Sequence, residues 1–485
     1  MTRSQRGMTA AQAWLLALTS VASLMVALDA LVVSTALSTI RVHLHASLAG
    51  LEWTVNAYVL SLAVLLMTGA ALGDRLGRRR LFAAGMALFT AASAACALAH
   101  NVGWLIAARA VQGAGAAVMM PLALALLSAG FPPAQRPKAL GIFGAVTGLG
   151  VVLGPLVGGA VVQGISWPWI FWLNVPIGLA TIALTRARIG ESFGPDSALD
   201  LPGLTLVTGG VFGVVWALVR GNTAGWGSPE VIAALAAGVV LGAAFIAWEL
   251  RARSPMLPMQ LFGSRPFAAG NAAVFFMWGS VLGAVFFLAQ FLQIALHYSP
   301  LAAGIRLMPW GAAVFVAAPI AGARIRRAGE RPLIVGGLLL AAAGTAWLAL
   351  AATPHLAYWQ LLVPLILAGL GFSAAVPATQ NSVLSHLAPQ YIGKASGTFT
   401  MLRQLGGAFG VALAVAAFAG RGSYASAQAF SDGFRPALGI CAALALAGSI
   451  AGLLAPARPD TSQLAVAAAA AASRQPAEAN APGPT

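Results

Sequence analysis

Long apolar runs separated by short polar stretches recur along nearly the whole chain. Each run holds about 20 residues, enough for a helix to cross the roughly 30 Å hydrocarbon core of a bilayer. A helix satisfies its own backbone hydrogen bonds in lipid, so each run predicts one membrane span. The pattern predicts an all-α polytopic membrane protein with fourteen transmembrane helices near residues 14–40, 53–72, 81–99, 104–129, 138–163, 170–185, 204–219, 229–249, 268–293, 301–321, 332–352, 359–382, 396–419 and 436–455.

Composition agrees with this pattern. Of 485 residues, 59% are hydrophobic and only 8% are charged, whereas soluble domains carry roughly 25% charge. A soluble protein is therefore excluded, and the lipid bilayer is the expected surrounding. The net charge of +15 could suggest a nucleic-acid partner, but the basic residues lie in short loops without interleaved aromatic residues. The two cysteines, Cys96 and Cys441, both lie inside apolar runs, which excludes a disulfide framework and a thiolate metal site.

The distribution of Lys and Arg predicts the orientation. With the N-terminus inside, twenty of the 27 basic residues fall on the cytoplasmic side, four fall outside, and three lie within spans. This bias fits the positive-inside rule and predicts a multi-pass protein of the cytoplasmic (inner) membrane with both termini in the cytoplasm. The first run follows MTRSQRGMTA and precedes further spans, so we interpret it as an anchor and not a cleaved signal.

The chain also contains an internal repeat. KALGIFGAVTGLGVVLG from Lys138 matches KASGTFTMLRQLGGAFG from Lys394 at one constant offset, with identical residues that include Lys138, Gly141, Phe143, Gly150 and Gly154. Two similarly oriented halves are typical of transporters with a site at the interface between halves. We predict an N-terminal six-helix bundle over residues 1–195, a two-helix insert over 196–262, a C-terminal six-helix bundle over 263–455 and a disordered tail over 456–485. A duplicated membrane scaffold without transport is the alternative.

Asp29 is the acidic residue that stands out, because we find no other acid in the interior of a predicted span. A buried carboxyl neutralises, pairs or faces water, and one that switches between these states can carry protons across a membrane. Asp29 could also be a permanently neutral hydrogen-bonding group or the static partner of a buried arginine. Arg109, in the stretch AARAVQGAGAA, is a guanidinium inside a span and needs an acceptor; Asp29 is a candidate, directly or through water, as are carbonyl groups and Gln112. The alternative for Arg109 is a structural cation bonded to carbonyls.

The loop LGDRLGRRR, residues 72–80, combines glycines for a tight turn with an acid among four arginines. Such a loop can lock two helices in one state and release them in another, or it can serve only as a positive-inside anchor. The candidates for a gate are Gly73, Asp74, Arg75, Gly77, Arg78 and Arg79.

The stretch GVVLGPLVGG begins at Gly150. Gly150, Gly154 and Gly158 are spaced by four and form one face without side chains, where another helix can approach closely. Pro155 removes a backbone hydrogen bond and bends the helix, and Gly159 follows the stripe. A bendable, closely packed helix can open or seal a pathway, although ordinary helix packing is the alternative.

Other polar and aromatic residues within the spans are candidates for lining a cavity, although such residues more often belong to the core or face lipid. These candidates are Trp53, Tyr58, Gln112, Arg306, Arg403 and Gln404. We find no HExxH, GxSxG, Walker A, GxGxxG or metal-spaced His/Cys pattern. The sequence therefore predicts a protein that is not an enzyme and uses no metal or cofactor, with a proton gradient in place of ATP as the energy source.

Together these motifs resemble the major facilitator superfamily, and within it the fourteen-span drug:proton antiporters of the QacA-like branch. The resemblance covers about residues 10–455 and includes LDALVVSTAL, AALGDRLGRR, RAVQGAGAA, GVVLGPLVGG and RQLGGAFG. The stretch WPWIFWLNVP departs from the family pattern, with Pro168 in the place of an arginine.

The resemblance implies export of lipophilic, often cationic small molecules, including drugs, driven by proton entry. With Asp29 as the one membrane acid, divalent cations are disfavoured, which suggests either a low proton stoichiometry or neutral, zwitterionic or even anionic substrates. The alternatives are a narrow exporter of an endogenous metabolite or antibiotic and a non-transporting receptor or scaffold. Whether a periplasmic adaptor takes the product onward is left open.

Overall fold

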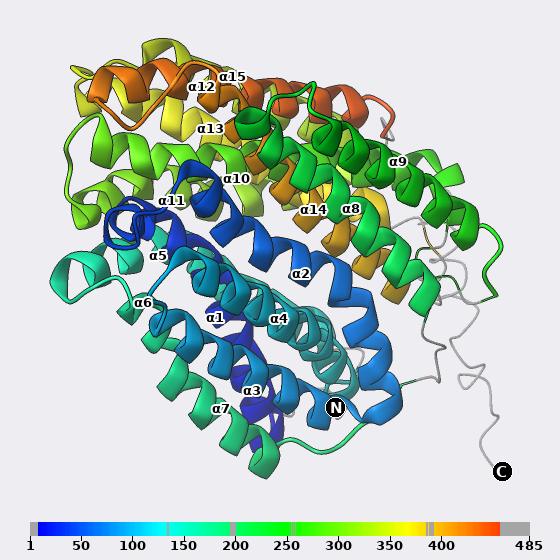
Figure 1. The fold of residues 1–485 in the computed structure, drawn as a ribbon. Coiled ribbons are helices and arrows are strands. Elements are labelled where there is room, and N and C mark those ends of the chain that lie inside the picture. Colours follow the sequence, from blue (N-terminus) through cyan, green and yellow to red (C-terminus); the bar gives the residue numbers. More distant parts are fainter. Residues whose placement is uncertain are drawn as a thin grey trace, which may run out of the picture.

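The computed structural model describes residues 8–132, 135–194, 200–253, 255, 257, 259–384, 387 and 392–455. These residues form helices joined by short connections (Figure 1). The elements are α1 (Ala10–His43), α2 (Leu48–Leu76), α3 (Arg78–Ala97), α4 (Val102–Gly130), α5 (Arg136–Gly164), α6 (Trp169–Trp172), α7 (Asn174–Arg188), α8 (Leu201–Ala224), α9 (Pro229–Glu249), η1 (Met259–Gly263), α10 (Arg265–Ile294), α11 (Pro300–Ala328), α12 (Glu330–Ala351), α13 (Tyr358–Leu384), α14 (Ile392–Ala419) and α15 (Ala427–Gly452).

Helix starts follow the polar residues between apolar runs. Thr9 caps α1 in a capping box with Gln12, and the side chains of Ser47 and Asn101 cap α2 and α4. Each cap accepts a hydrogen bond from a backbone N–H group that the helix leaves unpaired at its first turn.

The fourteen predicted spans are confirmed in the described part of the chain, where α6 and α7 together form one span over Trp169–Arg188. The last span was predicted too short, because α15 begins at Ala427 and not at residue 436. The polar residues before Pro436 suggested a loop. The structure keeps them helical, since Ser426 caps the helix and Asp432 accepts a hydrogen bond from Gln428 one turn earlier.

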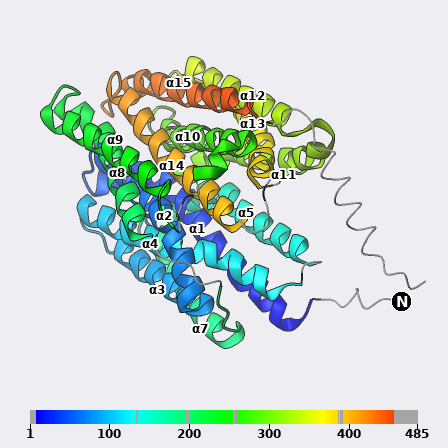
Figure 2. The ribbon, with the colours of Figure 1, turned by 90° about the vertical axis from the view of Figure 1, so that its right-hand side faces the viewer.

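The helices form the two six-helix bundles of the predicted fold, with α1–α7 in the lower half of Figure 1 and α10–α15 in the upper half. The bundles meet along two seams, α5 against α11 and α2 against α14. The inserted helices α8 and α9 pack on each other, and α8 also contacts α2 and α14; both lie at the left edge of Figure 2. The insert therefore covers one of the two seams. The domain limits at residues 195 and 262 stay a prediction.

For description, we call the side at which α1 begins the inner side, following the charge pattern, and the opposite side the outer side. The bundles are closed on the outer side. Gln293 of α10 donates to the carbonyl of Thr35 at 3.0 Å, and Arg41 lies 4.0 Å from the ring centre of Tyr424. Gly159 of α5 leaves no room for a Cβ against Pro300 at the start of α11.

The inner half of α5 has a different surrounding. A Cβ built on Gly141, Gly144 or Gly148 would meet no atom of a described residue within 4 Å, and the same holds for Gly322 near the inner end of α11. The seam between α5 and α11 is thus tight at its outer end, whereas these glycines near the inner ends of the two helices have open space beside them.

Candidate transport site

Asp29 and Arg109 form an ion pair in the core of the N-terminal bundle. The side chains of Asp29 on α1 and Arg109 on α4 are each 1% exposed. Nη1 of Arg109 donates to Oδ2 of Asp29. The other carboxylate oxygen accepts from the amide of Gln112 at 2.8 Å and from the amide of Asn174 at 3.2 Å. Both oxygens of Asp29 are therefore satisfied, and Arg109 binds Asp29 directly as its charged partner.

Arg109 has partners besides the acid. Its Nε donates to the carbonyl of Thr54 at 3.2 Å, and Nη1 also donates to Gln112 at 2.7 Å. The guanidinium carbon lies 4.1 Å from the ring centre of Tyr58. A desolvated guanidinium over an aromatic face gains about 2 kcal/mol. Tyr58 and Gln112 thus belong to the Asp29–Arg109 network and line neither of the two described cavities.

The network reaches two further residues that the sequence analysis did not select, Ser93 on α3 and Asn174 at the start of α7. The amide of Gln112 donates to the Ser93 hydroxyl at 2.8 Å, and the amide of Asn174 does so at 3.4 Å. The network therefore joins α1, α2, α3, α4 and α7. Asn174 lies in the WLNVP part of a family-like motif, which was the signal that could have identified it.

The statement that Asp29 is the only acid inside a span is wrong. Glu52 on α2 is completely buried; one oxygen accepts from the Asn56 amide at 3.4 Å, and Oε2 has no partner among the described residues. The predicted span began at residue 53, one position too late to include Glu52. In the structure Ser47 caps the helix, so Glu52 lies in its second turn.

The loop between α2 and α3 is closed by the segment that follows α7. Gly77 has φ +106, a conformation that favours glycine, and joins the two helices directly. Asp74 accepts from Arg78 at 2.8 Å, the charge-assisted bond that its position predicts. Glu191 accepts from the backbone N–H of Arg79 at 2.8 Å and lies 3.5 Å from the Nε of that residue.

Two backbone hydrogen bonds also join the loop between α2 and α3 to the segment that follows α7. Arg78 donates to the carbonyl of Ser192 at 2.8 Å, and Gly194 donates to the carbonyl of Asp74 at 3.0 Å. Gly73 packs against Leu122 of α4, and Arg75 lies in the last turn of α2. These contacts hold the loop to the N-terminal half of the chain. Its role as a gate stays a prediction.

The glycine stripe of α5 packs on α1. A Cβ on Gly150 would lie 2.9 Å from Ala27, and one on Gly154 would lie 2.8 Å from Leu31, both closer than real Cβ atoms approach. Gly158 leaves no room against Thr35.

On another face of the same helix, Gly159 and Pro155 contact α11, the latter through its carbonyl against Gly304. The motif therefore contacts the helix that carries Asp29 and the opposite bundle at the same time.

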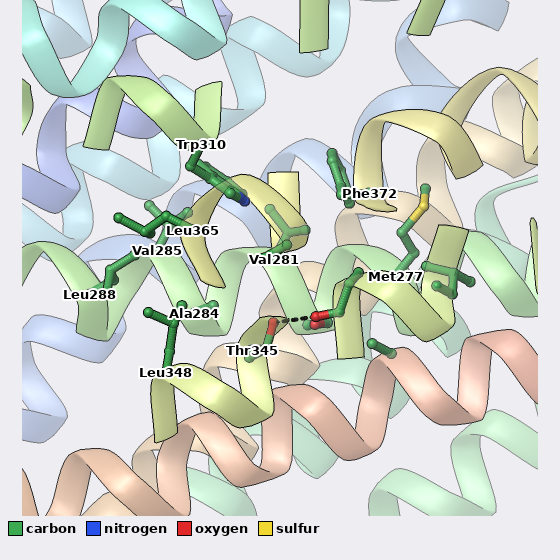
Figure 3. A pocket seen from close by; sticks show the side chains of 15 residues that line it. Met277, Val281, Ala284, Val285, Leu288, Trp310, Thr345, Leu348, Leu365 and Phe372 are labelled. Atoms are coloured by element: carbon green, nitrogen blue, oxygen red, sulfur yellow. Dashed lines mark hydrogen bonds between the residues drawn. The ribbon is translucent and has the colours of Figure 1, made fainter. Parts of the chain in front are cut away.

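Two cavities lie near the bundle interface. Figure 3 shows the first, inside the C-terminal bundle, where Val281, Trp310 and Phe372 converge from α10, α11 and α13. The second adjoins it, because the same three residues also line it. Leu31 of α1 forms part of the second wall, so this cavity lies between the two bundles.

The profile of the Major Facilitator Superfamily matches residues 19–411, most of the helical part. The chain belongs to the Major Facilitator Superfamily. It is similar to the tetracenomycin C resistance and export protein of Streptomyces glaucescens, with 36% identity over 81% of this chain and 73% of that protein. It is also similar to the puromycin resistance protein pur8 of Streptomyces alboniger, with 36% identity over 82% and 80% of the two chains.

Solved structures agree on the fold. The peptide transporter POT in complex with sulfate matches with a TM-score of 0.67 over 96% of each chain, at 16% identity. A bacterial homolog of the lysosomal transporter Spinster, in an inward-facing conformation, matches with a TM-score of 0.65 over 92% of this chain and 97% of that chain, also at 16% identity. This facilitator protein is therefore a multi-pass membrane transporter and not an enzyme.

The remaining residues that the sequence selected lie in different places on the facilitator fold. Trp53 contacts Phe212 of the insert, with ring centres 5.8 Å apart. Arg306 lies in the outer part of α11, 3.8 Å from the ring centre of Tyr298, and donates to the carbonyl of Ala302. Neither Trp53 nor Arg306 lines a described cavity.

Arg403 is placed differently. Its guanidinium carbon lies 5.0 Å from the ring centre of Trp278, and Trp278 lines the cavity between the bundles. Gln404 follows it on α14 and is half-buried.

Proposed function

We propose that this transporter exports lipophilic small molecules by alternating access in exchange for protons, with Asp29 as the coupling carboxyl. The observation that carries the proposal is the packing of the α5 glycine stripe on the turns of α1 that surround Asp29, at Ala27 and Leu31. Gly154 packs on α1 and Gly159 packs on α11, and the two glycines lie only five positions apart on α5. A movement of α5 against α11 therefore also changes the contact between α5 and α1.

The network around Asp29 suits an exchange of partners. When Asp29 takes up a proton, Arg109 loses its counter-ion, but it keeps the Thr54 carbonyl, the Gln112 oxygen and the Tyr58 ring. Neutral Asp29 keeps its amide donors. Breaking an isolated buried ion pair is strongly unfavourable, since it leaves an uncompensated charge. These additional partners lower the free energy of the broken state.

The coupling has a direct energetic consequence. A proton that enters through a potential of 100 mV releases roughly 2.3 kcal/mol, which is about a factor of fifty in substrate gradient. When the outer side is closed, the contacts between Gln293 and Thr35 and between Arg41 and Tyr424 separate Asp29 from the outside. Proton release is then directed inward, and reopening of the outer side admits the next proton.

A second candidate is export of one endogenous metabolite or antibiotic. It is favoured by the relatives, several of which are named for a single compound, such as tetracenomycin C and puromycin. Others are named as multidrug resistance proteins. A narrow response across a chemically broad panel of compounds would favour the single-substrate function, and a wide response would favour multidrug export.

Everted membrane vesicles with a preset pH gradient test the proposal. We expect substrates to dissipate the gradient in vesicles that contain the wild-type protein and not in vesicles that contain Asp29→Asn at the same level. Asp432→Asn is the matched control, because Asp432 lies near the outer end of α15 and binds only Gln428 among the described residues. Full dissipation by Asp29→Asn would remove Asp29 from the coupling role.

A further inference from the structure

The cavity between the bundles has aromatic walls. We call it the interface pocket and define it by Leu31, Trp278, Trp310, Phe372 and Ser373. The ring centres of Trp278 and Phe372 lie 5.5 Å apart at 80°, and those of Trp310 and Phe372 lie 6.4 Å apart at 34° (Figure 3 shows the second pair). The faces and edges of such rings are surfaces on which a further flat ring packs favourably once the bundles move apart and the pocket widens.

One polar group of the pocket lacks a partner. Ser373 is 1% exposed and lines the interface pocket, yet its hydroxyl has no hydrogen-bond partner in the described part of the protein. Burying an unsatisfied hydroxyl costs about 1–3 kcal/mol, and native structures rarely leave one without a reason. A polar substituent on a bound molecule would satisfy it.

A cation stands next to the same walls. The guanidinium of Arg403 lies against Trp278, and its buried Nε has no hydrogen-bond partner within the described ranges. No carboxylate of a described residue forms an ion pair with it. An arginine inside a membrane span is costly unless it is paired or faces water, and Arg403 is half-buried, so its guanidinium beside a cavity is suited to pair with an anionic group.

Comparison with the other arginines in the spans supports this assignment. Arg109 is paired with Asp29, and Arg306 donates to the carbonyl of Ala302 near the outer end of α11. Asp29 lies two positions before Leu31, which lines the pocket, but its carboxylate is already paired with Arg109. Arg403 therefore places a positive charge against Trp278, one wall of the interface pocket, and the described residues that line the pocket include no acid.

We propose that the interface pocket and Arg403 bind a planar aromatic substrate that carries an anionic group. The rings of the substrate pack on the aromatic walls, its anionic group pairs with Arg403, and a polar ring substituent bonds to the Ser373 hydroxyl. This inference rests on the proposed export function and names its substrate class. It also has an electrical consequence: exchange of a monovalent anion for one proton moves net charge, whereas exchange of a monovalent cation for one proton does not.

Equilibrium binding to the purified full-length protein in lipid nanodiscs tests the charge preference. The probes are anthraquinone-2-carboxylate and its neutral isostere anthraquinone-2-carboxamide, which share the same rings. We expect the wild type to bind the carboxylate about tenfold more tightly than the amide, the effect of one hydrogen-bonded charge. Arg403→Gln should remove this difference and leave the affinity for the amide unchanged, which also shows that the pocket is intact. Arg435→Gln, an exposed arginine of α15, is the charge-matched control.

Equal wild-type affinities for the two probes, equal losses of both in Arg403→Gln, or no binding of either probe would overturn the assignment. The test needs no gradient, so it is separate from the export proposal. Charge-selective binding without gradient-driven transport would refute the export proposal and keep the pocket assignment. Gradient-driven transport without charge-selective binding would do the reverse.

Discussion

Removal of Arg109 provides a quantitative test of the buried ion pair. In Arg109→Gln, the carboxylate of Asp29 loses its cation while the Asp29 side chain stays 1% exposed. Loss of one partner of a buried pair costs about 3–5 kcal/mol. Asp29 keeps the donors of Gln112 and Asn174, so we expect the lower end of this range, about 3 kcal/mol.

The double variant Asp29→Asn/Arg109→Gln separates charge from packing. It removes both charges and keeps two amides of similar shape, so it should recover at least half of the loss in the free energy of unfolding. Thermal unfolding of Arg109→Gln, Asp29→Asn, the double variant and the wild type in one detergent gives the order of stability. An Arg109→Gln variant as stable as the wild type, or a double variant less stable than Arg109→Gln, would refute the assigned cost of breaking the pair.

Three further substitutions test separate parts of the structure. Gly159→Leu should keep the fold but reduce export at least about tenfold, since the side chain would hold α5 away from Pro300 when the outer side closes; an unchanged export rate contradicts this. Gly77→Ala should lower stability by about 1 kcal/mol or more, because φ is +106 and the new Cβ would meet Glu191; an unchanged unfolding temperature argues against the strained turn. Glu52→Gln should change stability by less than about 0.5 kcal/mol, because Glu52 forms no ion pair with a described residue; a large loss of stability would show that Glu52 is held as a charge.

Hydropathy predicted the fold well because every span must be apolar and long enough to cross the bilayer. The ion pair was also predictable, since Asp29 and Arg109 are charges in a medium that tolerates few of them. Neutral polar residues carry no such signal, so Ser93 was not found although it binds two amides of the network. Glu52 was missed because the edge of a hydropathy window does not locate the helix cap at Ser47.

The direction in which a side chain points was the least predictable property. Tyr58 and Trp53 were equal candidates for a cavity, but one stacks on Arg109 and the other contacts the insert. Their placement depends on the rotation of α2 about its axis, which is set by glycine contacts such as that of Gly69 with Ala117 of α4. Such contacts join residues far apart in the sequence, and hydropathy does not encode them.

Transport by purified protein in proteoliposomes tests the central claim, that Asp29 couples export to proton entry. Two rates are measured with the same substrate: accumulation driven by an imposed pH gradient, and exchange of labelled for unlabelled substrate without a gradient. For Asp29→Asn we expect exchange close to the wild-type rate and no gradient-driven accumulation. Gradient-driven accumulation by Asp29→Asn at the wild-type level would contradict the account.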